Sequence, residues 1–242
     1  MRLAIFSDVH ANLEALKAVI SDIEQLNVEK VVFLGDAVGY GANPDKCVKL
    51  IDSLCEIKLL GNHDYVAMGL ESPSSFNEMA KQSILWTQQQ LKRKSIERLS
   101  EFEMEVSFLD YAFVHATPEN PSEWGYMLMV EDATRNFNFF SQNYCFVGHS
   151  HLPAVFRRGN DGKVVLETKT QFEGDGESRY IINVGSVGQP RDGNRDACYL
   201  IAETDGNRFE YRRIPYDLKA AQKKMKKAEL PEFLITRLAI GK

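Results

Sequence analysis

The sequence predicts an α/β fold, and three features of its 242 residues lead to this prediction. Short apolar segments alternate with amphipathic helical segments from the N-terminus onward, which is the pattern of β-α-β units. The early apolar segments are continuous rather than alternating, so the sheet that they form should be covered on both faces. The later segments are separated by the turn sequences Asn160-Asp161-Gly162, Gly174-Asp175-Gly176 and Asp205-Gly206-Asn207, which suit hairpins, so we expect these segments to form antiparallel strands.

The first sixty residues are expected to form a β-α-β-α-β unit. Apolar residues at helical spacing predict a helix over Asn12–Gln25. A second helix should begin at Asn43-Pro44, because asparagine suits the N-cap and proline suits the first helical position. The three strands of this unit are expected at residues 3–6, 31–34 and 57–60.

A helical insertion over residues 66–107 is expected between the third strand and the next apolar segment. Its helix should cover roughly Phe76–Leu99, and its position suggests a lid that limits substrate size. A charged helix from about Leu218, interrupted at Pro231, follows the last strand. We expect one domain over residues 1–242, with further strands at 111–114, 144–147, 154–157, 164–168, 180–184, 198–202 and 209–213.

The composition excludes several classes of protein. With 44% hydrophobic residues and a net charge of −5, the chain is neither collagen-like nor disordered, and its acidic balance argues against binding to nucleic acid. The longest apolar run, Ala197–Ala202, is far shorter than the roughly 20 residues of a membrane span. The four cysteines have no C-x-x-C spacing, which argues against a disulfide framework or a thiolate zinc site. With no secretory signal, we expect a cytoplasmic protein that does not contact a membrane.

Side chains that can bind metals follow five of the predicted strands. Sites in open α/β sheets form beyond the carboxyl ends of the strands, so these side chains should meet at one place. All five histidines of the chain belong to this set. Histidines with purely structural roles would not all follow strands, so we expect a functional site. The strands end in Asp8-Val9-His10, Gly35-Asp36, Gly61-Asn62-His63-Asp64, His115 and Gly148-His149-Ser150-His151.

The donor types indicate the metals. Oxygen and imidazole donors without thiolates suit divalent Mn, Fe, Zn or Ni. Two such ions about 3.5–4 Å apart need a carboxylate that bridges them, and Asp36 is the natural candidate. A pair of ions can hold a shared hydroxide for attack on a phosphoryl group and can neutralise the charge that develops there.

The ordered set D-x-H, G-D, G-N-H-D, H and G-H-x-H resembles the calcineurin-like metallophosphoesterase superfamily. The resemblance covers about residues 3–151, and residues 183–191 look like a segment of its small bacterial and archaeal phosphodiesterase members. It implies a four-layer α/β/β/α sandwich of two mixed sheets with a dinuclear centre. It also implies that His63 contacts the substrate phosphate and protonates the leaving oxygen. The implied ligands are Asp8, His10, Asp36 and His151 for one metal and Asp36, Asn62, His115 and His149 for the other.

One segment departs from a subgroup of this superfamily. Phosphoprotein phosphatases have G-D-x-x-D-R-G after the second strand, whereas residues 35–41 here read G-D-A-V-G-Y-G. The aspartate that supports the histidine in those enzymes is absent, so we do not expect phosphoprotein phosphatase activity. Asp64 is another possible partner for His63, although adjacent side chains in extended chain point apart.

Three more residues are candidates for substrate binding. Arg191 lies in a glycine-rich loop and could contact a phosphate, or it could form a surface ion pair. Asn12 could face the substrate, or it could cap the first helix. Tyr40 could stack on a nucleobase or simply pack against its neighbours.

The resemblance implies a phosphoesterase that uses two metal ions, such as manganese, and direct attack by a metal-bridging hydroxide. Its expected substrates are small phosphodiesters or phosphomonoesters of the nucleotide type, including dinucleoside polyphosphates. A non-catalytic scaffold is the main alternative, but such relatives have lost ligands or the motif histidine, whereas all of these are present here. A DNA nuclease is a third hypothesis, which the acidic balance argues against. The oligomeric state is left open.

Overall fold

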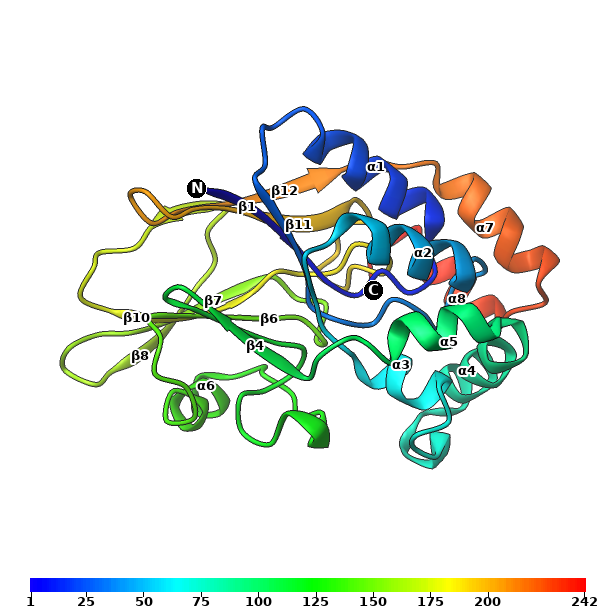
Figure 1. The fold of residues 1–242 in the computed structure, drawn as a ribbon, viewed down its shortest axis with the longest axis horizontal. Coiled ribbons are helices and arrows are strands. Elements are labelled where there is room, and N and C mark those ends of the chain that lie inside the picture. Colours follow the sequence, from blue (N-terminus) through cyan, green and yellow to red (C-terminus); the bar gives the residue numbers. More distant parts are fainter.

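The computed structural model describes all residues 1–242 and contains two mixed six-stranded sheets that pack face to face (Figure 1). The first sheet consists, in spatial order, of β3 (Ile57–Lys58), β2 (Lys30–Phe33), β1 (Arg2–Phe6), β11 (Ala197–Glu203), β12 (Arg208–Ile214) and β9 (Gln171–Glu173). The second consists of β4 (Glu105–Phe108), β5 (Tyr111–Val114), β6 (Tyr144–Val147), β10 (Arg179–Asn183), β7 (Ala154–Arg158) and β8 (Val164–Glu167). With helices on both outer faces, these sheets confirm the expected α/β/β/α sandwich.

The core between the sheets is rich in aromatic rings. Phe146 of β6 and Phe209 of β12 come from opposite sheets, and their ring centroids lie 6.0 Å apart. Phe113 of β5 stacks on Phe146 with a centroid distance of 5.4 Å. All three rings are buried, and aromatic rings contribute the largest apolar areas to such a core. This packing fixes the two sheets relative to each other.

Helices close the outer faces. On the first sheet, α1 (Leu13–Ile23) and α2 (Pro44–Leu54) bury their apolar sides against β1, β2 and β11. On the second sheet, α6 (Val130–Asn136) packs against β7 and β8. Asn12 caps α1, since its side chain accepts a hydrogen bond from the Ala15 N–H. As predicted, α2 begins at Pro44 with Asn43 at the N-cap position, but the Asn43 side chain makes no capping hydrogen bond, and its amide donates to the Ala42 carbonyl instead.

The segment from 66 to 107 is mostly helical but differs in detail from the prediction. After the short helices α3 (Asn62–Ala67) and η1 (Pro73–Ser75), the expected single helix is divided into α4 (Glu78–Gln90) and α5 (Arg93–Leu99). The strand β4 begins within the last residues of the segment, because Glu105–Phe108 pair with β5. The short elements β9, α6 and η2 (Pro121–Glu123) have no clear signal in the sequence.

One predicted hairpin is wrong. The turn at Gly174–Gly176 connects β9 of the first sheet to β10 of the second, so its flanking strands do not pair with each other. The turn residues reverse the chain, but tertiary packing selects the partner, and β9 pairs with the open edge of β12. The turns at 160–162 and 205–207 do connect antiparallel neighbours, as predicted.

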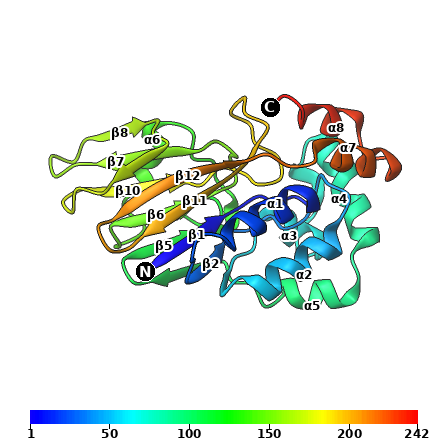
Figure 2. The ribbon, with the colours of Figure 1, turned by 90° about the horizontal axis from the view of Figure 1, so that it is seen from above.

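The C-terminal helices and the strand directions determine where a site can form. Both α7 (Leu218–Lys227) and α8 (Glu232–Arg237) lie beyond one end of the sandwich, near α4 (Figure 2). The parallel strands β1, β2 and β3 of one sheet and β5 and β6 of the other direct their carboxyl ends to that same end. No helix of the structure has the length and apolar character needed to span a membrane.

Candidate metal centre

Asp and His side chains from five strand ends form one buried cluster. Potential ligand atoms lie within 4.8 Å of one another in three overlapping groups, which share His10 and Asp36. All of these side chains are buried, although carboxylates and imidazoles are costly to bury without partners. The groups are Asp8, His10 and His151; His10, Asp36 and His63; and Asp36, His115 and His149.

Asp36 lies at the middle of the cluster. Its Oδ2 atom is 3.5 Å from Nε2 of His10 and also 3.5 Å from Nε2 of His115. On one side, Nε2 of His10 lies 3.0 Å from Nε2 of His151, which is itself 3.3 Å from Oδ1 of Asp8. One carboxylate is therefore shared by two groups of donors.

Backbone carbonyls orient three of the imidazole rings. Nδ1 of His10 lies 3.0 Å from the Val38 carbonyl oxygen, and Nδ1 of His115 lies 2.8 Å from that of Leu34. Nδ1 of His151 lies 2.6 Å from the carbonyl oxygen of Gln189. When Nδ1 carries the proton and donates a hydrogen bond to the carbonyl oxygen, the lone pair of Nε2 is free to bind a metal. This arrangement is typical of histidines that bind a metal.

Several atoms in the cluster have no hydrogen-bond partner. Oδ1 of Asn62, Nε2 of His115 and Nε2 of His149 are buried and unpaired. Buried polar atoms nearly always have partners, so a group of unpaired acceptors beside two carboxylates is unfavourable without a cation. The donors present are oxygen and imidazole nitrogen, a set that divalent first-row metals accept. The residues therefore fit a metal centre.

The backbone at the strand ends adopts an uncommon conformation. Five candidate ligands, Asp8, His10, Asp36, His149 and His151, have φ values between 47° and 65°. Residues other than glycine rarely adopt this left-handed region, although Asp and His tolerate it better than most. Such strain is concentrated at functional sites, where the surrounding structure maintains it. Here it directs the side chains of consecutive turns toward one point.

A glycine beside Asp36 makes the close approach of two loops possible. A Cβ atom at Gly61 would lie 2.1 Å from Oδ1 of Asp36. The Oδ1 atom instead accepts a hydrogen bond of 2.9 Å from the His63 N–H. The glycine of the G-N-H-D motif thus leaves room for the central carboxylate.

The electrostatics of the cluster are dominated by burial and by the two carboxylates. Burial raises the pKa of Asp8 and of Asp36, but the surrounding histidines outweigh it and hold both well below the usual range. Burial lowers the pKa of His115, but Asp36 and Asp8 outweigh it and raise that value to about 9, so Nε2 carries a proton at neutral pH unless a cation takes the place of that proton. For His149, burial and the charge of His115 lower the pKa to about 3. The carboxylates thus hold negative charge that attracts cations.

His63 lies at the edge of the cluster among aromatic rings. Its ring centroid is 4.5 Å from that of Tyr40 and 4.6 Å from that of Phe76, which belongs to the insertion. Burial, opposed by Asp36, lowers the pKa of His63 to about 4. Its Nδ1 atom is buried without a partner. The insertion therefore reaches the edge of the cluster through Phe76, and its role as a lid stays a prediction.

Asp64 does not pair with His63. Its carboxylate accepts hydrogen bonds of 3.1 Å from the N–H groups of Ala37, Val38 and Gly61, so it joins the ends of β2 and β3. Burial and the charge of Asp36 raise the pKa of Asp64 to about 7. Its role in the structure is to hold the two ligand-bearing loops together.

The other substrate-binding candidates differ in their surroundings. Asn12 uses both ends of its side chain within the protein, since its amide also donates to the Gly188 carbonyl at 2.9 Å. This supports the capping role. Arg191 forms no ion pair; its Nη2 donates to Gln189 at 3.0 Å, and its Nε is buried and unpaired. Tyr40 is packed between His10 and His63, with both centroid distances 4.5 Å, so stacking on a nucleobase is not supported.

Two aromatic residues near the cluster had no motif to identify them. The ring of Tyr126 lies 4.3 Å from that of His149, and half of its surface is exposed. Trp124 lies 6.0 Å from His115. Both belong to the loop that follows β5, and their close spacing in a loop after a ligand histidine is the one signal that could have indicated them.

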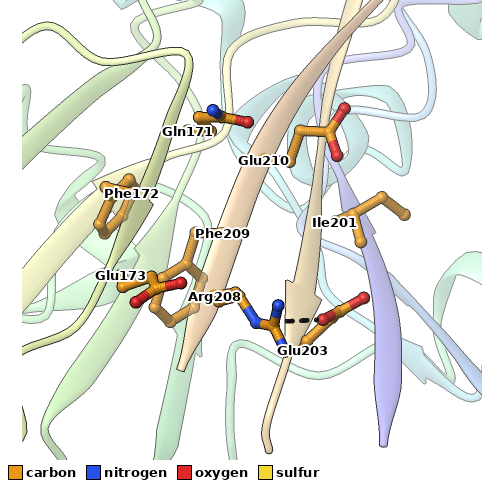
Figure 3. Close-up of a pocket in the computed structure, with 8 residues that line it drawn as sticks. All are labelled: Gln171, Phe172, Glu173, Ile201, Glu203, Arg208, Phe209 and Glu210. Carbon is orange, nitrogen blue, oxygen red and sulfur yellow. Dashed lines mark ion pairs between the residues drawn. The ribbon is translucent and has the colours of Figure 1, made fainter. Parts of the chain in front are cut away.

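A separate pocket lies at the opposite end of the first sheet (Figure 3). Its walls come from β9, β11 and β12, and Arg208 pairs with Glu203 within it. Glu203 is opposite Arg2 at the start of β1, whereas Asp8 follows the end of that strand. This pocket is therefore distant from the Asp/His cluster and takes no part in it.

Comparison with known proteins identifies a family model and several proteins that this chain resembles. A model of the calcineurin-like phosphoesterase superfamily domain matches residues 1–207. An uncharacterized protein of Methanocaldococcus jannaschii is 40% identical over 247 residues, which is 99% of this chain and 98% of that protein. The crystal structure of a metallophosphoesterase from Sphaerobacter thermophilus is 39% identical and has a TM-score of 0.88, covering 100% of this chain and 99% of the other. A hypothetical protein from Pyrococcus horikoshii has a TM-score of 0.79 at 17% identity, covering 100% and 98%, and shares the fold.

Proposed function

Because the chain belongs to the calcineurin-like phosphoesterase superfamily, we propose that its Asp/His cluster holds two divalent cations and hydrolyses small phosphate esters of the nucleotide type. The observation that carries the proposal is the position of Asp36, whose Oδ2 atom is 3.5 Å from Nε2 of both His10 and His115. One carboxylate can therefore serve two neighbouring cations, as a dinuclear centre requires.

The proposed ligands divide into two sets that share Asp36. The unpaired atoms of Asn62, His115 and His149 support the second set, and the facing Nε2 atoms of His10 and His151 support the first. The donors suit Mn, Fe, Zn and Ni. Manganese is the ion to test first. The first set is Asp8, His10, Asp36 and His151, and the second is Asp36, Asn62, His115 and His149.

Two divalent cations, when bound, lower the pKa of water and neutralise charge on the phosphoryl oxygens. The residues of the chain prepare the site for them. The carbonyl groups that face Nδ1 of three histidines hold the rings in place before any ligand binds, which reduces the reorganisation needed in the reaction. Arg191, with an unpaired Nε and no carboxylate partner, is proposed to contact the substrate phosphate.

His63 is proposed to contact the phosphate and to give a proton to the leaving oxygen. Its ring lies beside the cluster, 4.8 Å from that of His10. Burial holds its pKa at about 4, so the protonated form requires a nearby anion. The substrate phosphate brings that negative charge to the ring, and the proton is then available where the leaving group departs.

The proposed substrates are nucleotide-type diesters and monoesters, including dinucleoside polyphosphates. Phe76 contacts His63 from the insertion, which supports the idea that this segment limits substrate size. A non-catalytic scaffold finds no support in the site, because His63 and the implied aspartate and histidine ligands lie together there. A substrate contact from Asn12 and a cytoplasmic location both stay predictions.

The test is hydrolysis of bis-p-nitrophenyl phosphate, p-nitrophenyl phosphate and an alkyl phosphate ester with manganese, together with measurement of bound metal. Asp36→Asn should lose both metal and turnover. His63→Ala should keep its metal but lose rate, most of all with alkyl leaving groups, which need protonation. Glu131→Gln, on the exposed surface of α6, is the matched control and should behave as wild type. Full turnover by Asp36→Asn would overturn the proposal.

A further inference from the structure

Two aromatic rings from the segment between β5 and α6 lie against histidines of the proposed second metal set. The ring centroid of Tyr126 lies 4.3 Å from that of His149, with an angle of 35° between the ring planes. The ring centroid of Trp124 lies 6.0 Å from that of His115. One short segment therefore brings two aromatic side chains to neighbouring candidate ligands.

The two rings differ in what surrounds them. The Trp124 ring is held by the insertion, since its centroid lies 5.7 Å from that of Tyr65 and its Nε1 donates a hydrogen bond of 3.3 Å to Glu71. The Tyr126 ring packs on the His149 ring, and the residue is 51% exposed. The contact with His149 covers part of Tyr126 only, so the exposed half is accessible to a ligand.

The backbone holds Tyr126 in place on both sides. Before it, Gly125 lies so close to Thr117 that a Cβ atom on the glycine would be 2.8 Å from the Thr117 Oγ1 atom. After it, the Met127 side chain is buried in the apolar cluster between α6 and the second sheet. An aromatic ring that is fixed in advance loses little freedom when a ligand binds to it, which favours affinity.

The turn that precedes Tyr126 is strained. Trp124 has a φ of 54°, in the left-handed region that bulky residues rarely adopt. Strain of this kind is concentrated at functional sites, where the surrounding structure maintains it. Because Trp124 lies two residues before Tyr126, its conformation sets the direction in which the chain reaches Tyr126.

An exposed aromatic ring beside a phosphate-binding site is suited to an aromatic group of the substrate. Every nucleobase has a π face, and stacking on an aromatic side chain binds it without hydrogen bonds to its edges. Tyr40, the residue that the sequence suggests for this contact, is packed between two histidines and is 8% exposed. Tyr126 both contacts a proposed ligand and has free surface, so it meets the two requirements that Tyr40 does not meet together.

We propose that Tyr126 stacks on the nucleobase of the substrate and is a specificity-determining residue of the site. The inference rests on the proposed function, because the phosphate of the same ligand must bind at the Asp/His cluster. It narrows the substrate class to phosphate esters whose organic group carries an aromatic base, in preference to esters of sugars or other aliphatic alcohols.

The experiment compares two phosphonates that cannot be hydrolysed, the analogues of adenosine 5′-phosphate and of ribose 5-phosphate in which a CH2 group replaces the ester oxygen. They share the phosphonate and the ribose, and only the first has adenine. Calorimetry on the manganese-loaded protein gives both Kd values, and the wild type should bind the adenosine compound more tightly. Tyr126→Ala should raise the Kd of the adenosine compound about tenfold, as expected for the loss of one base–aromatic stack. It should leave the Kd of the ribose compound unchanged, and Tyr126→Phe, which keeps the ring, should retain most of the affinity.

Phe139→Ala is the matched control and should change neither Kd. Phe139 follows α6 and is exposed to a similar degree, 49%, but it belongs to no part of the cluster. An unchanged Kd of the adenosine compound in Tyr126→Ala overturns the inference, and so does a wild type without preference for that compound. An equal rise in both Kd values also overturns it, because that result shows that the ring supports His149 and not the base.

Manganese-dependent hydrolysis of bis-p-nitrophenyl phosphate by the wild-type protein tests the proposed function separately. Turnover without a preference for the adenosine compound overturns the inference alone. Absence of turnover overturns the proposed function, and the inference that rests on it is then overturned as well.

Discussion

Gly39→Ala should slow catalysis by displacing the His63 ring. Gly39 has a φ of 86°, and a Cβ atom there would lie 2.4 Å from Nδ1 of His63. Ordinary van der Waals contact begins at 3.4 Å, so the ring would have to move by about 1 Å. A displacement of this size in a reacting group costs about 10²-fold in rate, or about 2.7 kcal/mol in activation free energy. Bound metal should stay near the wild-type amount, because His63 is not among the proposed ligands.

Gly69→Ala is the control that distinguishes displacement of the His63 ring from backbone strain alone. Gly69 has a φ of 79°, but a Cβ atom there meets nothing within 4 Å. Gly69→Ala should lose about 1–2 kcal/mol of unfolding free energy, since alanine is disfavoured at positive φ, and Gly39→Ala should lose more, because its overlap with the buried His63 ring adds to the same strain. Only Gly39→Ala should lose turnover of alkyl phosphate esters, measured at saturating manganese. A rate within threefold of wild type for Gly39→Ala, or an equal loss of rate in Gly69→Ala, would refute the reasoning.

Three other predictions concern stability. Manganese at about 100 times its Kd should raise Tm by roughly 5–10 °C in differential scanning fluorimetry, from about 2.7 kcal/mol of linked binding, and Asp36→Asn should abolish the rise. The Arg212 guanidinium bonds to Asp22 at 2.8 and 2.9 Å and lowers the pKa of that carboxyl. The ion pair therefore stabilises the folded protein fully above the unfolded pKa of Asp22, which is near 3.9. This stabilisation is lost as the pH falls through the lower pKa of the folded state. Asp22→Asn should therefore cost about 1–3 kcal/mol in urea unfolding at pH 7 and progressively less below pH 4; an equal cost at pH 2 would contradict this. Phe146→Ala, in the core between the sheets, should cost about 3–5 kcal/mol in the same assay, whereas Phe139→Ala, at a half-exposed position, should cost less than about 1 kcal/mol.

Most of the secondary structure could be predicted because it depends on local patterns. Continuous apolar runs followed by helical spacing identified β1 to β3, α1 and α2 within a residue or two at most boundaries. The missed elements, which include β4, β9, η2 and α6, are short and carry weak periodicity. The Gly174–Gly176 turn was assigned to a hairpin because local turn chemistry reports a reversal of the chain but not the identity of the partner strand.

The candidate site shows the same division. Strand ends could be identified along the chain, and the rule that sites form beyond them predicted that Asp8, Asp36 and His115 would lie near one another. The partner of Asp64 could not be predicted, because its three N–H donors come from two different loops. The contact between the C-terminal segment and the loop after β10 was equally hidden, because the Gly193 N–H donates to the carbonyl oxygen of Gly241, which lies more than forty residues later in the chain.

The sequence by itself determined the order of strands and helices, the donor types and the family to which the chain belongs, because these follow from residue identity and short-range spacing. Tertiary structure alone decided which Nε2 atoms face Asp36 and which polar atoms stay unpaired. The physical reason is that distances between side chains far apart in the chain depend on the packing of two sheets and on left-handed turns at their ends, and neither is encoded within any one segment.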